Sequence, residues 1–129
     1  DKMLAMEGNT APYLMYAYAR IRSIYRRGAE SGAAGGSITL TEPAERVLAR
    51  QILRFPDTLE SAAATLKINL LTDYLYELAG QFMRFYESCP VLGAPTPETR
   101  ASRLRLCDLT ARTLQIGLGL LGIRVVERM

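Results

Sequence analysis

Apolar residues recur at helical spacing in every long segment of this chain, and this pattern constrains the fold more than any other feature. The clearest case is a seam near the end of the sequence: Leu104, Cys107, Ala111, Leu114, Leu118 and Leu121. Steps of three and four residues place these side chains on one face of a helix and are typical of helices packed in a bundle. No segment alternates between apolar and polar residues as a strand does. The sequence therefore predicts an all-α fold, an antiparallel helix bundle.

Prolines and glycines divide the chain into the expected helices. Three segments begin with a capping residue followed by a proline in the first turn, where the missing N–H costs nothing. We expect the end of an incoming helix over residues 2–7, and helices from Asn9 or Thr10 to about Arg27, from Thr41 to about Phe55, from Asp57 to about Leu66, from Asn69 to Ser88 and from Thr96 to Gly122. Gly28 is expected to stop the first long helix, Pro56 to interrupt the next, and Asn69 to cap the one over residues 69–88. Residues 28–37 contain four glycines and are expected to form a flexible surface loop.

The composition excludes several kinds of chemistry. The chain has 129 residues, enough for one domain, and no histidine, which excludes a histidine general base, a Ser-His-Asp triad and an imidazole metal site. Its two cysteines, Cys89 and Cys107, cannot form a four-thiolate zinc site and are expected to be reduced thiols of a cytosolic protein. No apolar run is long enough to span a membrane. Because Asp1 begins the sequence without a signal-peptide pattern, we interpret residues 1–129 as a single domain of a longer protein.

The first long helix has two distinct faces. Leu14, Tyr18, Ile21 and Tyr25 are expected to face the core, whereas Tyr13, Tyr16, Arg20 and Arg27 cluster on another face. An aromatic ring can stack on a base that is not stacked on its neighbours in the nucleic acid, and an arginine beside the ring can neutralise a phosphate. The alternative is that these tyrosines pack on a neighbouring helix or on the rest of a longer protein.

The remaining charged residues give weaker signals. Only Lys2 and Lys67 are lysines, and the other 14 basic residues are arginines, which suit phosphate recognition. Three of these arginines, Arg100, Arg103 and Arg105, lie in the first turns of the last expected helix, where they either bind a ligand phosphate or are simply solvated. Two more, Arg124 and Arg128, lie near the end of the chain. The carboxylate pairs Asp73/Glu77 and Glu42/Glu45 are expected to be surface residues, because no third metal ligand or histidine accompanies them.

Several short blocks resemble the anticodon-binding (DALR-type) domain of arginyl-tRNA synthetases, in the order found in that family. They are Glu7–Tyr13, Tyr16–Ser23, Tyr74–Ala79, Phe85–Glu87, Leu106–Thr110, Gly117–Ile123 and the terminal Glu127–Met129. The blocks reach from the first residues to the last. The resemblance implies a helical domain of the class Ia synthetase type, which follows a catalytic domain and ends where the enzyme ends.

The resemblance also implies a function and a set of site residues. The parent would be a cytoplasmic ligase that joins arginine to its tRNA with ATP and magnesium, while this part alone would hold no cofactor or metal and would be non-catalytic. Its partners would be the anticodon stem and loop of tRNA(Arg) and the catalytic domain of the same chain, with no membrane. The residues expected to face the tRNA are Tyr13, Tyr16, Arg20, Tyr86, Arg128 and Met129. The alternative function is a helical module that binds another protein through the Tyr13/Tyr16 face.

Overall fold

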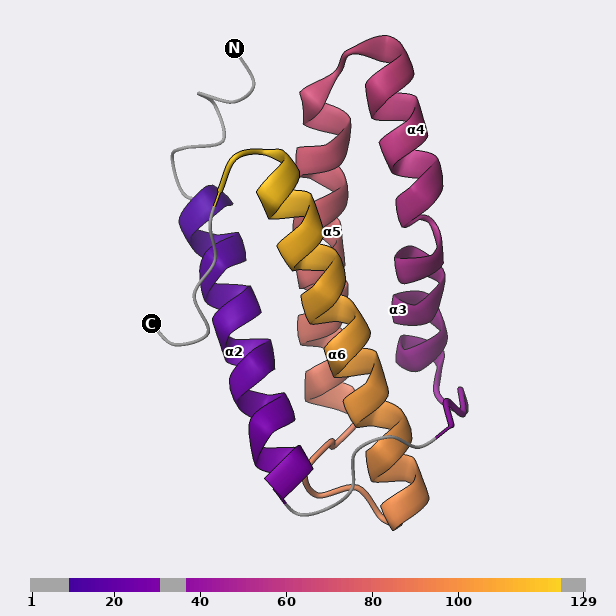
Figure 1. The fold of residues 1–129 in the computed structure, drawn as a ribbon. Coiled ribbons are helices and arrows are strands. Elements are labelled where there is room, and N and C mark those ends of the chain that lie inside the picture. Colours follow the sequence, from indigo (N-terminus) through magenta and orange to yellow (C-terminus); the bar gives the residue numbers. More distant parts are fainter. Residues whose placement is uncertain (1–9, 31–36, 124–129) are drawn as a thin grey trace.

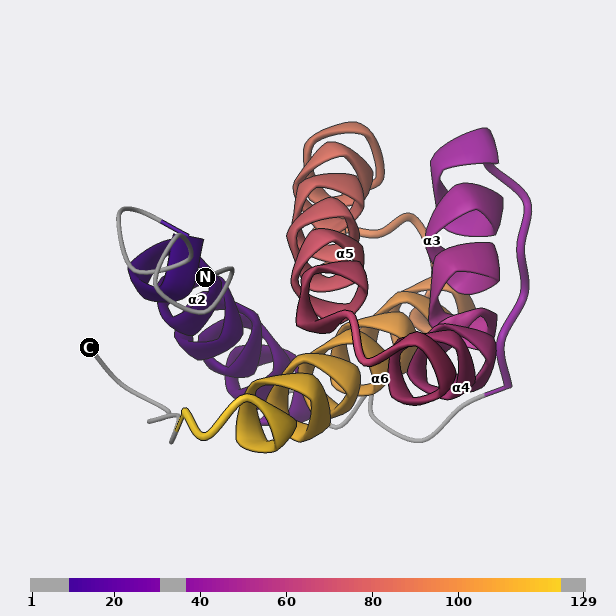
Figure 2. The same cartoon turned by 90° about the horizontal axis from the view of Figure 1, so that it is seen from above.

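Five α-helices make up the part of the chain that the computed structural model describes, residues 10–30 and 37–123. They are α2 (Thr10–Glu30), α3 (Pro43–Leu53), α4 (Phe55–Thr65), α5 (Ile68–Ser88) and α6 (Pro97–Leu120). α2 and α5 run in the same direction and α6 runs back against both, while α3 and α4 lie on the other side of α5 from α2 (Figures 1 and 2). The described residues contain no strand. The expected antiparallel helix bundle is confirmed.

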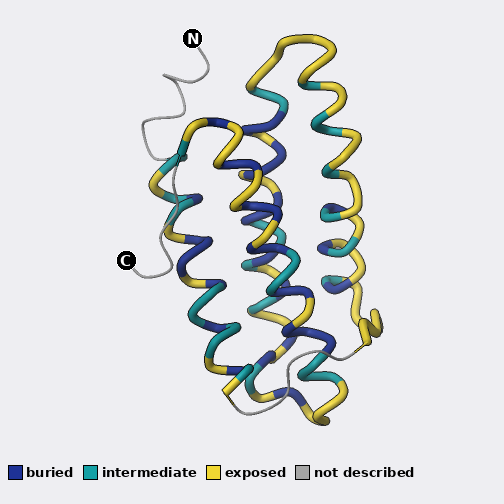
Figure 3. The backbone as a smooth tube through the Cα atoms, in the orientation of Figure 1, coloured by how far each residue is buried: buried dark blue, intermediate teal, exposed yellow. Residues whose placement is uncertain are grey.

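The core lies where α2, α5 and α6 meet. All six residues of the predicted seam on α6 and the turn after it are buried: Leu104, Cys107, Ala111, Leu114, Leu118 and Leu121. They pack against large side chains of the other two helices, including Leu14, Ile21, Leu75 and Phe82. α3 adds one fully buried apolar residue, Leu48, and α4 buries none, so α4 is the most exposed helix of the bundle (Figure 3).

Both ends of α6 follow the predicted signals. The Thr96 hydroxyl accepts a hydrogen bond from the Thr99 amide at 3.0 Å and so satisfies one of the amides that a helix start leaves without a partner. Gly122 follows the helix with a φ of +84°, a conformation that glycine adopts without strain. The Ile123 amide then donates to the Leu118 carbonyl at 2.9 Å, which closes the end of the helix.

The expected stop at Gly28 is wrong, because α2 continues to Glu30 and Gly28 is buried inside it. A Cβ atom at Gly28 would lie 2.4 Å from Leu104 Cδ2. The glycine therefore lets α2 approach α6 closely instead of ending the helix. Most of the expected loop over residues 28–37 lies outside the described residues, as does the expected helix end over residues 2–7.

Two further boundaries differ from the prediction. α3 ends at Leu53 and α4 begins at Phe55, so Pro56 lies in the first turn of α4 instead of interrupting a helix. This placement fits proline, because the first turn needs no N–H donor. α5 begins at Ile68, one residue before Asn69, with Lys67 in the capping position. Asn69 is therefore a helical residue and not the predicted cap.

A buried ion pair joins α3 to α6. Arg103 Nε donates to Glu45 Oε2 at 2.8 Å, and Arg103 Nη1 donates to the Pro90 carbonyl at 2.8 Å. Only 1% of Glu45 and 6% of Arg103 is exposed, which contradicts the expectation of a surface carboxylate and of an arginine on a phosphate or in solvent. Both residues point inward because each finds the opposite charge across the helix interface, a contact that single-helix spacing cannot reveal.

Glu45 also organises the start of α3. Its Oε1 accepts hydrogen bonds from the amides of Thr41 and Glu42 at 2.9 and 2.8 Å. Burial alone would favour the neutral acid, but the Glu42 amide, the Arg103 guanidinium and the Thr41 amide together hold the pKa of the Glu45 carboxyl below its ordinary value. Glu45 is therefore a charged, structural residue.

The two cysteines are buried and form no disulfide, as expected for reduced thiols. Burial in the seam raises the pKa of the Cys107 thiol to about 12, so this side chain behaves as a small apolar residue. Within residues 10–30 and 37–123, no helix has the length and apolar character needed to cross a membrane.

Candidate nucleic-acid interface

The outward face of α2 carries the aromatic and basic residues singled out in the sequence. Tyr16 is 52% exposed, Arg20 and Arg27 are exposed, and Tyr13 is half-buried. The opposite face of the same helix buries Leu14, Tyr18 and Ile21 in the core, as predicted. The two faces follow from helical spacing alone, since residues 13, 16, 20 and 27 fall within one sector of the helix.

Tyr86 of α5 lies opposite Arg20. The Arg20 guanidinium carbon is 5.8 Å from the centroid of the Tyr86 ring, within the range of a cation–π contact. The Tyr86 ring also stacks on Phe82, with centroids 6.1 Å apart and an angle of 11° between the planes. Because Phe82 is fully buried, the core holds the Tyr86 ring in place and the ring in turn positions Arg20. The structure thus brings together two of the predicted site residues from helices far apart in sequence.

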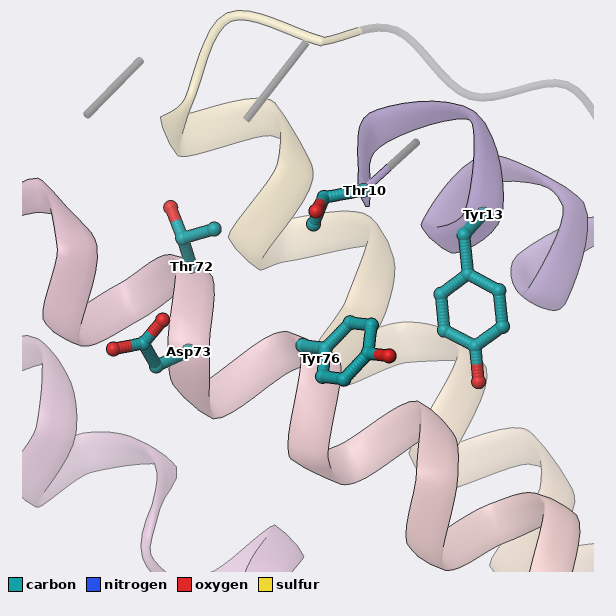
Figure 4. Close-up of a pocket in the computed structure, with 5 residues that line it drawn as sticks. All are labelled: Thr10, Tyr13, Thr72, Asp73 and Tyr76. Carbon is teal, nitrogen blue, oxygen red and sulfur yellow. The ribbon is translucent and has the colours of Figure 1, made fainter. Parts of the chain in front are cut away.

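A second aromatic pair bridges α2 and α5. The centroids of the Tyr13 and Tyr76 rings are 5.3 Å apart, with 47° between the planes. Beside the two rings lies a hollow of about 360 Å³, whose lining also includes Thr10, Thr72 and Asp73 (Figure 4). The hollow combines aromatic faces with hydroxyl and carboxylate oxygens, groups that suit the face and the edge of a base.

The charge state of Tyr13 follows from its surroundings. Burial and the neighbouring Tyr76 raise the pKa of the Tyr13 hydroxyl, and the Arg84 guanidinium opposes this shift only in part. Tyr13 therefore remains neutral and can donate a hydrogen bond at physiological pH without adding negative charge near a phosphate.

The other predicted site residues fall into separate places. Arg128 and Met129 lie outside the described residues, as does Arg124. At the start of α6, Arg103 is buried in the ion pair with Glu45, Arg100 is half-buried and Arg105 is exposed. Asp73 and Glu77 are exposed on α5, as expected. In the part of the chain that the structure describes, no group of three or more histidine, cysteine, aspartate or glutamate residues could hold a metal ion.

Comparison with known proteins decides the family. A family model described as the DALR anticodon binding domain matches residues 14–129. The chain belongs to the DALR anticodon-binding domain family.

Relatives of this DALR domain carry the name arginine–tRNA ligase. A Synechocystis protein of that name is 60% identical over 131 residues, and one from Edwardsiella ictaluri is 52% identical over 130 residues. Each alignment covers the whole of this chain and only 22% of the length of the relative. The chain therefore spans about a fifth of the length of these relatives.

Solved structures with the same fold carry matching names. The arginyl-tRNA synthetase of Thermus thermophilus superposes with a TM-score of 0.83 at 36% identity, over 96% of this chain and 22% of that one. The Plasmodium falciparum arginyl-tRNA synthetase gives a TM-score of 0.79 at 32% identity, with the same coverage.

Sequence reasoning singled out the α2 residues of this candidate surface, but on α5 it singled out only Tyr86. It assigned no role to Tyr76, although a signal existed: Tyr76 is off the apolar face formed by Leu71, Leu75 and Leu78. An aromatic residue on the polar side of a helix is a candidate for a binding surface. Only the structure shows that Tyr76 meets Tyr13 across the interface.

Proposed function

We propose that residues 1–129 form the anticodon-reading domain of an arginine–tRNA ligase and bind the anticodon stem and loop of tRNA(Arg). The observation that carries this proposal is the outward face of α2, where exposed Tyr16 and Arg20 lie beside half-buried Tyr13 and are completed by Tyr86 of α5, in a chain of the DALR family. Exposed rings next to a guanidinium provide what an unstacked loop nucleotide requires, namely a stacking surface and a donor for phosphate or a base edge.

Each residue has a distinct role in this proposal. Tyr16 is more exposed than Tyr13, so its ring is available to stack on a base. Arg20, oriented by the Tyr86 ring, contacts a phosphate or a base edge. Arg128 and Met129 contribute from the end of the chain. Met129 packs on an unstacked base as an apolar side chain.

The chemistry of the parent lies elsewhere in its length. We place the catalytic domain, ATP and its magnesium in the part of the ligase that this chain does not span, and assign no step of the reaction to residues 1–129. The role of the DALR domain is then to position the tRNA. In a full-length ligase that carries this domain, Arg20→Ala weakens the use of tRNA, whereas the binding of arginine and ATP persists.

The direct test is a titration of the 129-residue chain with a fluorescein-labelled anticodon hairpin of tRNA(Arg), followed by anisotropy at two salt concentrations. The proposal predicts saturable binding that weakens steeply with salt, because phosphate contacts release counterions. Arg20→Ala lowers the affinity, and the matched control Arg50→Ala, an exposed arginine on α3, leaves it unchanged.

The competing function predicts a different result. If the Tyr13/Tyr16 face serves a protein partner, the chain shows no affinity for the hairpin, and its association with that partner is insensitive to salt. Absence of hairpin binding by the wild-type chain would contradict the tRNA-reading proposal.

A further inference from the structure

We propose that α5 supplies a second nucleotide position beside the α2 face, where the Tyr76 ring carries an unstacked base of single-stranded RNA and Arg84 pairs with the adjoining phosphate. This inference rests on the proposed RNA-binding function and deepens it. It adds two residues that are not among the site residues implied by the resemblance, and it assigns an orientation to the bound nucleotide.

The surface for the base is the Tyr76 ring. Tyr76 is 55% exposed, and its contact with Tyr13 holds the ring at the boundary between α5 and α2. The hollow of about 360 Å³ opens next to the two rings (Figure 4). A large exposed ring with a neighbouring hollow is a stacking platform of the kind that single-stranded RNA uses.

The site for the phosphate is the Arg84 guanidinium. Arg84 Nη1 lies 3.6 Å from the position that a Cβ at Gly80 would occupy, so the side chain folds back along α5 over the bare glycine. Gly80 lies between Tyr76 and Arg84 on α5, and Arg84 is near enough to Tyr13 for its positive charge to lower the pKa of the Tyr13 hydroxyl in part. Arg84 is exposed and makes no ion pair with a carboxylate among the described residues. Its charge is therefore available to an anion.

The far side of the hollow sets the orientation of the nucleotide. Asp73 precedes Tyr76 by three residues on α5 and lines the hollow with Thr10 (Figure 4). The Asp73 carboxylate repels a phosphate and accepts hydrogen bonds from amino groups. The phosphate therefore lies at the Arg84 end and the base edge at the Asp73 end. Bases with an exocyclic amino group, namely adenine, guanine and cytosine, are favoured over uracil.

The phosphate contact is tested with hairpins that each carry one neutral methylphosphonate linkage at a different loop position. For the wild-type chain, one of these linkages should lower the affinity about fivefold, the size expected for one charge-assisted contact at an exposed site. Arg84→Gln should lower the affinity for the unmodified hairpin by a similar factor. The same neutral linkage should then have no further effect on the variant. Arg50→Gln on α3 should retain the wild-type response at every linkage.

The base contact is tested with Tyr76→Ala and Tyr76→Phe. Tyr76→Ala should weaken binding about fivefold or more, and Tyr76→Phe should retain the affinity, because stacking needs the ring and not the hydroxyl. Circular dichroism melting should show the Arg84 variant to be as stable as the wild type and the Tyr76 variants to remain folded, since both side chains are exposed and Tyr76→Ala removes only the ring contact with Tyr13.

The outcomes separate this inference from the function on which it rests. If Arg84→Gln and Tyr76→Ala bind the hairpin as the wild type does while Arg20→Ala binds weakly, the second position is wrong and the α2 face stands. The second position is also wrong if Arg84→Gln still responds to every neutral linkage that affects the wild type. If the wild-type chain fails to bind the hairpin, the proposed function itself is overturned.

Discussion

Arg103 and Arg20 show how one residue type serves two purposes in the same bundle. Arg103 is 6% exposed and bound to the Glu45 carboxylate and the Pro90 carbonyl. Arg20 is exposed and rests against the Tyr86 ring, with no carboxylate partner among the described residues. The comparison teaches that the surroundings of an arginine, not its presence, separate a structural contact from a candidate RNA contact.

The largest expected difference concerns folding. Arg103→Met removes one partner of the buried pair and leaves the Glu45 carboxylate without its counter-charge. We expect the free energy of unfolding to fall by about 3–5 kcal/mol, the usual cost of an uncompensated buried charge. Urea unfolding followed by circular dichroism measures it. A loss below about 1 kcal/mol would contradict the structural role of the pair.

Substitution on the exposed face of α2 should have a smaller effect, and this effect should be on binding and not on folding. Tyr16→Ala should weaken hairpin binding by about 1–3 kcal/mol through the lost stacking surface and change stability by less than about 0.5 kcal/mol. The matched control is Ile116→Ala on α6, since Ile116 is 54% exposed and Tyr16 is 52% exposed. If the two variants bind the hairpin equally well, the position of the Tyr16 ring on α2 does not matter for binding, and the stacking role of Tyr16 is contradicted.

Acid titration should test the structural role of the Glu45–Arg103 pair separately from the exposed face of α2. The pKa of Glu45 is held below its ordinary value of 4.5, so the stability that its ionised form contributes is present above about pH 4.5 and is lost as the pH falls through the lowered folded-state pKa. The melting temperature of the wild type should therefore drop on acidification. Glu45→Gln should start lower but drop less between about pH 7 and about pH 3. Parallel curves for the two proteins would place the acid sensitivity elsewhere.

The smallest expected effect is on salt dependence. Arg20→Gln should reduce the slope of log affinity against log salt by about 0.7, the value for one phosphate contact on a single strand. Ile116→Ala should keep the wild-type slope. An unchanged slope for Arg20→Gln would indicate a base-edge contact for Arg20 instead of a phosphate contact.

The features of the fold that could be predicted are those that depend on neighbouring residues along one helix. Thr96 and Pro97 fix the start of α6, and the apolar seam fixes its buried face, because both depend only on neighbours along one helix. The role of Gly28 was missed because it depends on Leu104, which lies on another helix. Spacing cannot distinguish a glycine that ends a helix from one that allows a close approach.

The same limit applies to the site. The shared face of Tyr13, Tyr16 and Arg20 could be predicted because it depends only on spacing along α2, whereas their role in binding rests on the family resemblance and stays a prediction. The burial of Glu45 and Arg103 could not, since each charge faces inward only because the other does. The contact of Tyr76 with Tyr13 likewise could not, since it depends on the packing of α5 against α2.

The most direct test of the central claim is a nuclear magnetic resonance titration of the ¹⁵N-labelled chain with the anticodon hairpin of tRNA(Arg). We predict that amide shifts change along Tyr13–Arg20 of α2 and Tyr76–Tyr86 of α5, and that the amides of Glu45 and Arg103 stay unperturbed. Shift changes concentrated on α3 and α4, with none along Tyr13–Arg20, would contradict this claim.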